Sequence, residues 1–371
     1  MMTGACLLSL PLGARAADVT FASVPDEMRW AGVPGASLAT LDGGAIVAAP
    51  FGMRNVAARL PVTASTIFEA GSVSKPVFTY AVLGLVGAGK LDLRRPLDAY
   101  LPVPYPIDDP RAKEITAHHV MTHTSGLPNW RPGDVGPLSL GFSPGTRYLY
   151  SGEGYYFLQT VVEHITGMST GEFMRRALDT LGMHRSSYVW RDEYAADCAL
   201  PYGQNLRPLS PDSRLVGEQL IAMGDAVGRP FETWTTSQAL AALPRLTPPL
   251  KAVPHNAMPN AAWSLFTTAG ELAKFVQALV HEPNHPMLVP QLQMSTYVWR
   301  GLGIQLQRWG GRTAFFHTGS NPGFKTAIFG DISGDRGVVS MANSNGGFVF
   351  EMHVIDSALG EQPAVFYLEE P

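Results

Sequence analysis

Two residues near the N-terminal end of the 371-residue chain have side chains that could perform nucleophilic catalysis together. Ser72 and Lys75 form the pattern Ser-x-x-Lys, and side chains three residues apart lie on one face of a helix. A serine hydroxyl is a weak nucleophile until a neighbouring base accepts its proton. A lysine amine can act as that base where burial or nearby positive charge lowers its pKa. The pattern therefore predicts a serine nucleophile activated by a lysine one helical turn later.

The surroundings of this pair fit that chemistry. A strand-like run ends just before Ser72, and apolar side chains recur at helical spacing from Val77 to Val86. A serine at a helix start lies beside backbone N–H groups and a partial positive charge, which favour a developing oxyanion. Pro76 falls in the first turn, where one lost hydrogen bond costs little. A surface serine and lysine on a helix is the alternative, because so short a pattern also arises by chance.

Four segments together resemble one known family. Residues 68–75 (FEAGSVSK) strongly resemble the nucleophile segment of the serine β-lactamase and penicillin-binding protein superfamily. Residues 122–128 (THTSGLP), 144–155 (PGTRYLYSGEGY) and 317–324 (HTGSNPGF) resemble later motifs of its class C β-lactamase-like branch, which includes the family VIII carboxylesterases. Their order and rough spacing match, and the resemblance covers nearly all of residues 20–360.

The resemblance implies a role for each matching residue. Ser72 is then the acylated nucleophile, and Lys75 is the general base or the group that tunes it. Tyr150 is then a second proton shuttle, with Lys75 as the cation that lowers its pKa from about 10. Without the resemblance, Tyr150 would be interpreted as a core aromatic residue. The resemblance implies neither a metal ion nor an organic cofactor.

The segment 317–324 is implied to be a late strand beside the substrate. Its backbone would pair with the ester or amide group that reacts. The backbone N–H groups of Ser72 and Ser320 would then form the oxyanion hole. The residues implied to bind substrate are His317, Thr318 and Gly319.

Two positions depart from the family pattern. Gly152 stands where β-lactamases and peptidases usually carry an Asn that contacts the acyl amide and the lysine. His317 stands where β-lactamases carry a Lys that binds the substrate carboxylate, and histidine is mostly neutral at pH 7. Both changes point away from an efficient β-lactamase. We therefore expect a serine hydrolase with an acyl-Ser72 intermediate, most simply a carboxylesterase of the class C β-lactamase-like type.

Two other activities stay open. One is that of a β-lactamase or a D-amino-acid-specific (DD-peptidase-like) peptidase with the same catalytic residues. The other is that of a low-turnover penicillin-binding protein in which Gly152 has weakened the site. In every case the expected partner is a small molecule, namely an ester, an amide or a lactam. The oligomeric state also stays open.

Other patterns have simpler interpretations. Residues 141–145 (GFSPG) fit G-x-S-x-G, but Pro144 lacks the N–H that this motif needs for its oxyanion hole. His119 and His123, with His118 nearby, are spaced like a zinc pair, but no third ligand is evident, so structural histidines are expected. Five tryptophans could line an apolar acyl pocket, although packing is the simpler role of each: Trp130, Trp190, Trp263, Trp299 and Trp309.

Composition and the N-terminus restrict the class of protein further. A net charge of -4 without a basic run argues against nucleic acid as a partner. The two cysteines, Cys6 and Cys198, are too few for a disulfide framework, and no stretch is long and apolar enough to span a bilayer. A short apolar run followed by Ala-Arg-Ala predicts that residues 1–16 are a signal peptide and that the protein is periplasmic or secreted. A disordered tail on a cytoplasmic protein is the alternative.

Strand-like runs lie at both ends of the chain, and helical patterns occupy its middle. Residues 35–41 and 45–49 flank Asp-Gly-Gly and predict a hairpin. We predict an α+β fold, in which N- and C-terminal segments form one antiparallel sheet flanked by helices, with a mostly helical insertion. The predicted sheet region is 17–92 and 263–371, and the insertion is 93–262. The other expected elements are strands at 302–306, 313–316, 326–329 and 338–341, helices at 116–123, 154–165, 264–280 and 349–359, and an irregular stretch at 201–259.

Overall fold

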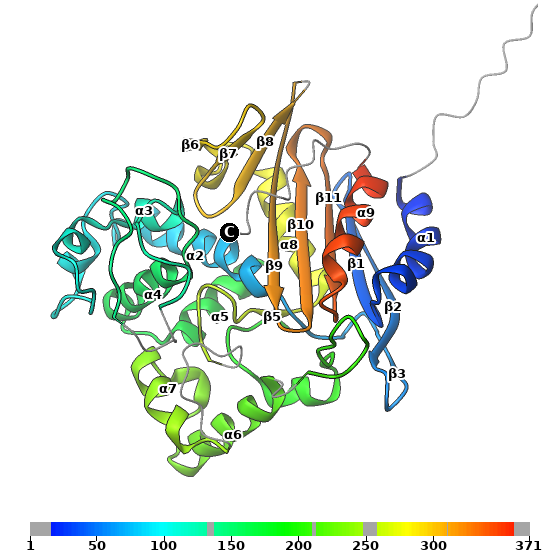
Figure 1. Cartoon of the computed structure of the whole chain (residues 1–371), viewed down its shortest axis with the longest axis horizontal. Coiled ribbons are helices and arrows are strands. Elements are labelled where there is room, and N and C mark those ends of the chain that lie inside the picture. Colours follow the sequence, from blue (N-terminus) through cyan, green and yellow to red (C-terminus); the bar gives the residue numbers. More distant parts are fainter. Residues whose placement is uncertain (1–15, 132–136, 210–212, 248–257, 310, 360–371) are drawn as a thin grey trace, which may run out of the picture.

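One antiparallel sheet organises the chain. The computed structural model describes residues 16–131, 137–209, 213–247, 258–309 and 311–359 (Figure 1). Within these residues the strands of the large sheet follow the order β3-β2-β1-β11-β10-β9-β8-β7-β6. The N-terminal strands therefore join the C-terminal ones where β1 pairs with β11. The predicted fold class, an α+β fold with a sheet built from both ends of the chain, is confirmed.

The predicted hairpin is present, and a strand overlaps each of the four stretches predicted between residues 302 and 341. β1 (Gly35–Asp42) and β2 (Ala45–Asn55) are joined by Gly43 and Gly44, whose positive φ angles of 54° and 82° suit glycine. A separate pair joins β4 and β5. The remaining strands are β3 (Leu60–Pro61), β4 (Phe68–Glu69), β5 (Phe266–Thr267), β6 (Leu292–Gln293), β7 (Val298–Arg300), β8 (Gln305–Trp309), β9 (Arg312–Asn321), β10 (Phe324–Asp331) and β11 (Arg336–Ala342).

Helices cover both faces of the large sheet. α1 (Ala16–Ala31) and α9 (Gly347–Leu359) lie side by side on one face, where Phe350 joins apolar side chains of the strands (Figure 1). α8 (Ala269–His281) packs on the opposite face, and its Phe275 belongs to the larger core. Among the described residues, no helix has the length and apolarity needed to cross a membrane.

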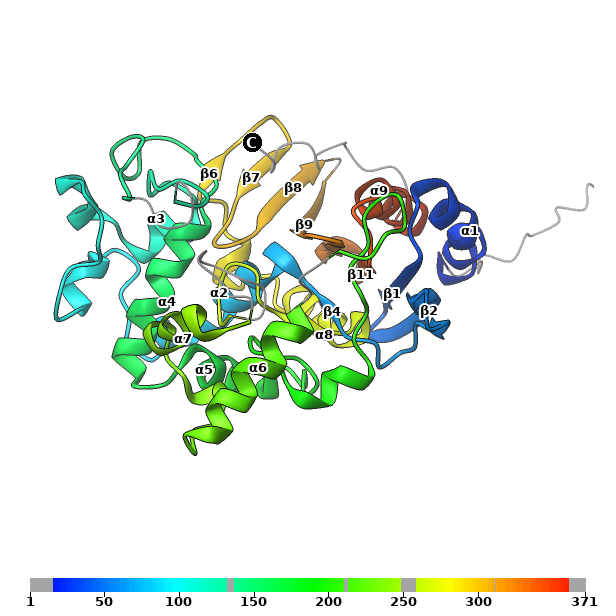
Figure 2. The same ribbon diagram turned by 60° about the horizontal axis from the view of Figure 1, so that its bottom comes forward.

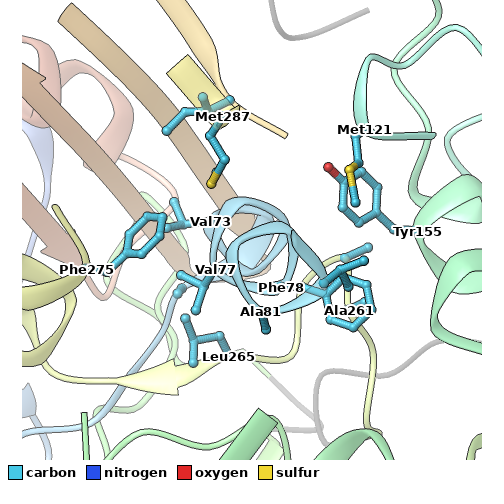
Figure 3. Packing of buried hydrophobic residues seen from close by; sticks show 14 of the residues in the cluster. Val73, Val77, Phe78, Ala81, Met121, Tyr155, Ala261, Leu265, Phe275 and Met287 are labelled. Atoms are coloured by element: carbon cyan, nitrogen blue, oxygen red, sulfur yellow. The ribbon is translucent and has the colours of Figure 1, made fainter. Parts of the chain in front are cut away.

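α2 (Ser74–Gly87) runs between the sheet and the inserted helices. Figure 3 shows that apolar side chains surround it, with Phe275, Met287 and Tyr155 on different sides of the helix. A helix that is apolar nearly all round is a buried helix. Packing in the core therefore fixes the position of α2, the helix that follows Ser72.

The inserted helices gather on the other side of α2 from the sheet (Figures 1 and 2). The described strands all lie within 35–69 and 266–342. A division of the chain into 17–92 with 263–371 and 93–262 stays a prediction. The inserted helices are α3 (Ala117–Met121), α4 (Gly152–Thr166), α5 (Thr170–Thr180), α6 (Ser213–Ala226) and α7 (Thr236–Ala242).

Some element assignments from the sequence were wrong. The stretch 201–259 contains α6 and α7, which form a small core of their own around Leu220 and Trp234, so packing outweighs the proline-rich composition. The helix expected at 264–280 starts only at Ala269, because β5 pairs with β4 first. The short strands β6 and β7 were not predicted. The predicted signal peptide, 1–16, lies outside the described residues except for Ala16.

Candidate active site

Ser72 lies in a short turn that is held from both sides. It belongs to a 3₁₀ turn, Gly71–Val73, directly before α2, so it precedes the α-helix instead of starting it as expected. The Ser74 hydroxyl donates to the Gly71 carbonyl at 2.6 Å and accepts from the Leu265 N–H at 3.0 Å. The turn is thereby tied to the segment before β5, and the Ser72 side chain is half-buried.

The Lys75 amine is buried beside the Ser72 hydroxyl. Its Nζ lies 3.0 Å from Ser72 Oγ and donates to the Ala262 carbonyl, also at 3.0 Å. Lys75 is only 1% exposed. Burial disfavours the charged form of an amine, which is the condition under which lysine can accept a proton from serine. The closeness predicted from the three-residue spacing is present.

Tyr150 lies near the same amine and against a histidine. Lys75 Nζ is 4.6 Å from the centroid of the Tyr150 ring, and Tyr150 is buried. The His123 ring lies 4.3 Å from the Tyr150 ring, centroid to centroid, and its Nδ1 accepts from the Ser151 N–H at 3.0 Å. Burial first, and then the positive charges of Arg300 and Lys75, hold the pKa of His123 well below its usual range. This ring is therefore neutral at pH 7.

A close approach of two backbone segments brings Ser72 and Ser320 together. β9 passes the nucleophile turn so closely that a Cβ on Gly319 would lie 2.0 Å from Ala70 O and 3.2 Å from Ser72 N. A Cβ on Gly71 would lie 2.7 Å from Ser320 N. The two N–H groups predicted to form an oxyanion hole thus belong to facing segments, and glycine at positions 71 and 319 permits the approach.

The predicted substrate-binding residues of β9 differ in exposure. His317 is fully buried, and its Nδ1 lies 2.7 Å from the Thr318 carbonyl. Thr318 is half-buried. Gly319 is buried. Ser320, predicted for the oxyanion hole, is exposed, and its hydroxyl accepts from Lys325 Nζ of β10. The roles of these residues in substrate binding stay predictions.

A buried carboxylate ties β9 to the nucleophile segment and to α6. Glu69, at the end of β4, is 6% exposed. Its two oxygens accept from Asn321 Nδ2 at 2.8 Å and from Ser213 Oγ at 2.6 Å. These side-chain hydrogen bonds of Glu69 act together with the close backbone approach at Gly71 and Gly319. Both set the position of β9 relative to Ser72.

Gly152 is packed against an indole ring. A Cβ at this position would lie 2.5 Å from Cζ2 and Cη2 of Trp130. The Trp130 and Trp263 rings lie 4.3 Å apart, centroid to centroid, and both side chains are half-buried. Two of the five tryptophans considered for an acyl pocket thus meet beside the first turn of α4.

Comparison with known proteins identifies the family. The sequence model described as "Beta-lactamase" matches residues 24–358. The chain belongs to the beta-lactamase family. The four motif segments that carry the resemblance all lie within the matched residues.

Proteins similar to this family member carry several activities in their names. Penicillin-binding protein 4* of Bacillus subtilis (strain 168) is 28% identical over 149 residues, which are 34% of this chain and 32% of that protein. Esterase EstB of Burkholderia gladioli is 38% identical over 97 residues, 25% of each chain. These matches span a third or less of either relative. A solved class C beta-lactamase shares the fold, with a TM-score of 0.73 at 18% identity over 94% of this chain and 97% of that one.

Other residues that the sequence singled out in this beta-lactamase family member have local contacts of their own. Trp190 is buried in a separate small cluster, and Trp299 lies 5.7 Å from the Arg308 guanidinium. The Trp309 side chain lies outside the described residues. His119 accepts from the Thr116 N–H in a helix cap, which is the structural role expected for it. In the part of the chain that the structure describes, no cluster of three His, Cys, Asp or Glu residues could hold a metal ion.

Three residues that shape the site were not predicted to do so. From the sequence, His123 is only half of a possible zinc pair, and Trp130 is one of five tryptophans for which packing is a simpler role than lining an acyl pocket. Ala262, whose carbonyl accepts from Lys75, belongs to a segment without any chemical motif. Two signals were available for the first two residues, since His123 falls inside the THTSGLP segment and Trp130 follows it by two positions.

Proposed function

We propose that this beta-lactamase family member is a carboxylesterase that works through an acyl-Ser72 intermediate. The observation that carries the proposal is the 3.0 Å separation of Ser72 Oγ from a buried lysine amine. This geometry lets the hydroxyl pass its proton to Lys75 as the oxygen attacks a carbonyl carbon. Tyr150, against the same amine, is the group that exchanges protons with the leaving alcohol.

The reaction has two halves. In the first, the Ser72 oxygen bonds to the carbonyl carbon, and the N–H groups of Ser72 and Ser320 bind the negative oxygen. The bond to the alcohol oxygen then breaks, and the alcohol leaves with the proton that the serine gave up. In the second, a water molecule attacks the acyl-serine and passes its proton to the Lys75–Tyr150 pair. The acid leaves, and the proton returns to Ser72.

The surroundings of Ser72 support an ester better than a lactam or a peptide. Position 152 has no side chain to bind an acyl amide, and an indole fills the space beside it. His317, at the position implied to bind a carboxylate, is fully buried. A simple ester needs neither of these contacts. Esterase EstB, with which the chain shares 38% identity over 97 residues, is named for this activity.

The test compares three substrate classes on one enzyme preparation. We expect kcat/KM for a short-chain p-nitrophenyl ester to exceed that for a chromogenic cephalosporin and for a D-Ala-D-Ala peptide. Ser72→Ala should lower ester hydrolysis at least about a thousandfold. Cephalosporin turnover far above ester turnover would reject the esterase proposal, and full activity of Ser72→Ala would reject the nucleophile.

Mass spectrometry separates the remaining alternative, a low-turnover penicillin-binding protein. We expect a fluorophosphonate to label Ser72 permanently and a penicillin to leave no lasting adduct. A persistent penicilloyl group on Ser72, without ester turnover, would instead establish a binding protein.

A further inference from the structure

In the loop before α4, the large side chain of Trp130 packs against Gly152, which has no side chain, in the first turn of α4. The Trp130 ring atoms Cζ2 and Cη2 occupy the space around the Gly152 Cα, 2.5 Å from the position of a Cβ. Such a separation excludes any side chain at 152 unless the indole moves. The ring therefore takes the space that a longer residue at 152 would use.

The loop that carries Trp130 is fixed on both sides of the tryptophan. The carbonyl and the Oδ1 of Asn129 both accept from the Gly152 N–H at 3.0 Å. On the other side, the Arg131 guanidinium makes two bonds with the Glu153 carboxylate, at 2.8 and 2.7 Å. Each neighbour of Trp130 is thus bonded to the first turn of α4. The indole is held in place before any ligand arrives.

A second indole extends this surface toward β9. Trp263 lies against Trp130 and directly follows Ala262, whose carbonyl accepts from Lys75. The Trp263 carbonyl accepts from Asn321, the last residue of β9, at 3.4 Å. The indole pair is therefore bordered by three parts of the site. These are Lys75, the start of α4 at Gly152, and the end of β9 at Asn321. Half-buried rings in this position retain surface for a ligand.

We propose that Trp130 and Trp263 together form an apolar wall that selects esters whose acyl chains are unsubstituted and of medium length. The missing side chain at Gly152 leaves room for the Trp130 ring. This inference rests on the proposed function and names its substrate class. Alkyl carbon gains from contact with indole faces, roughly fourfold in binding for each buried methylene. An acylamino group would find no side-chain partner at position 152, and a polar group without a partner disfavours binding. Trp130 is a specificity residue, with no part in the proton transfers.

The experiment is a chain-length profile with p-nitrophenyl acetate, butyrate and hexanoate. For the unaltered protein we expect kcat/KM to rise about tenfold from acetate to butyrate. Trp130→Ala should reduce this ratio to about two or less, while Trp130→Phe keeps most of it. The matched control is Trp30→Ala, since Trp30 is 71% exposed on α1 and distant from the site. An unchanged profile in Trp130→Ala would overturn the proposal.

A second pair of variants tests the fit between the two positions. Gly152→Ala should lower both the melting temperature and ester activity, because its Cβ meets the indole. The same substitution in a Trp130→Ala background should cost clearly less, because the indole is gone and the remaining tight contact of the Cβ is with Asn129 O at 3.0 Å. Equal effects of Gly152→Ala in both backgrounds would show that the two residues are not complementary.

A labelling measurement separates failure of the wall from failure of the esterase proposal. Ethyl and hexyl fluorophosphonates react with Ser72 without any ester turnover. If no ester is hydrolysed, the esterase proposal fails, but the ratio of the two labelling rates still reports on the wall. We expect Trp130→Ala to reduce that ratio by about the same factor as the ester profile, and an unchanged ratio would overturn the wall.

Discussion

The nucleophile side of the site is built from backbone, whereas the opposite side is built from large side chains. At Ser72 the decisive contacts involve Gly71 and Gly319, where a Cβ would strike the backbone of the facing segment. At Gly152 the space beside the backbone is filled by Trp130, which lies against Trp263. In the proposed esterase, the first arrangement fixes where the oxyanion lies. The second arrangement then determines which groups can surround the acyl chain.

This difference separates chemistry from selectivity. Backbone N–H groups stabilise any oxyanion, whatever substrate carries it. Indole faces favour apolar substituents, and an indole offers no acceptor for an amide N–H. Substitutions on the backbone side should therefore lower activity on every substrate. Substitutions on the side-chain side should change relative rates between substrates or the stability of the wall.

The largest expected effect concerns the lysine and tyrosine beside Ser72. Lys75→Ala and Tyr150→Phe should each lower kcat/KM on a p-nitrophenyl ester by about a thousandfold. The double variant should be barely worse than either single one, because the residues act as a unit on the same proton. Tyr297→Phe, at an exposed tyrosine, is the matched control and should be silent. Multiplicative losses in the double variant would show that the two residues act independently.

The next effect tests the backbone side directly. Gly319→Ala should lower kcat/KM about a hundredfold on long and short esters alike, because its Cβ would push β9 away from Ala70 and displace an oxyanion donor. Steady-state kinetics on both esters measures the loss. The control is Gly84→Ala, on α2, where a Cβ meets nothing within 4 Å and the helix should gain up to about 1 kcal/mol of stability. A loss confined to one chain length would contradict the division between the two sides.

The ion pair beside Trp130 can be removed by a substitution that leaves both indoles in place. Arg131→Gln should lower the free energy of unfolding by about 2 kcal/mol, because it leaves the Glu153 carboxylate, 4% exposed, without its bidentate partner. Denaturant titration measures this loss. Arg214→Gln breaks the more exposed pair with Glu218 and should cost less than about 0.5 kcal/mol. Equal losses in the two variants would show that the Arg131–Glu153 pair stabilises the protein no more than the exposed Arg214–Glu218 pair does.

The parts of the molecule that the sequence predicted are those with short-range signals. The Ser-x-x-Lys spacing predicted that the Lys75 amine reaches the Ser72 hydroxyl, and the two atoms lie 3.0 Å apart. The Gly43–Gly44 turn predicted the first hairpin because glycine permits its positive φ angles. A local pattern predicted a strand at 313–316, within β9. The roles of Tyr150 and of residues 317–320 came from the family resemblance, because both lie far from Ser72 in the chain.

The parts that the sequence did not predict depend on packing between distant segments. Trp130 and Gly152 are 22 positions apart. No sequence pattern around either residue indicates that an indole fills the space of a missing side chain. α6 and α7 form in a proline-rich stretch because Leu220 and Trp234 share a small core. The helix expected at 116–123 ends at Met121, because His123 adopts a positive φ of 55°, which is uncommon outside glycine.

The smallest effect concerns the neutral ring behind Tyr150. Burial, with nearby positive charge, lowers the pKa of His123 in the folded protein, whereas in the unfolded chain the ring takes up a proton below about pH 6.5. The unfolded state therefore binds more protons below that pH. The stability that the neutral ring confers is complete above about pH 6.5 and falls by up to about 1.4 kcal/mol for each unit below it.

His123→Phe should remove this pH dependence while keeping a ring against Tyr150. Denaturant unfolding of both proteins at pH 7.5, 6.5 and 5.5 gives the difference that isolates this residue. His119 and His285, whose pKa values burial also lowers, are present in both proteins and cancel. The variant also loses the acceptor for the Ser151 N–H, which lowers its stability equally at every pH. We expect the two stability curves to converge as the pH falls, and parallel curves would show that His123 titrates alike in the folded and unfolded chains.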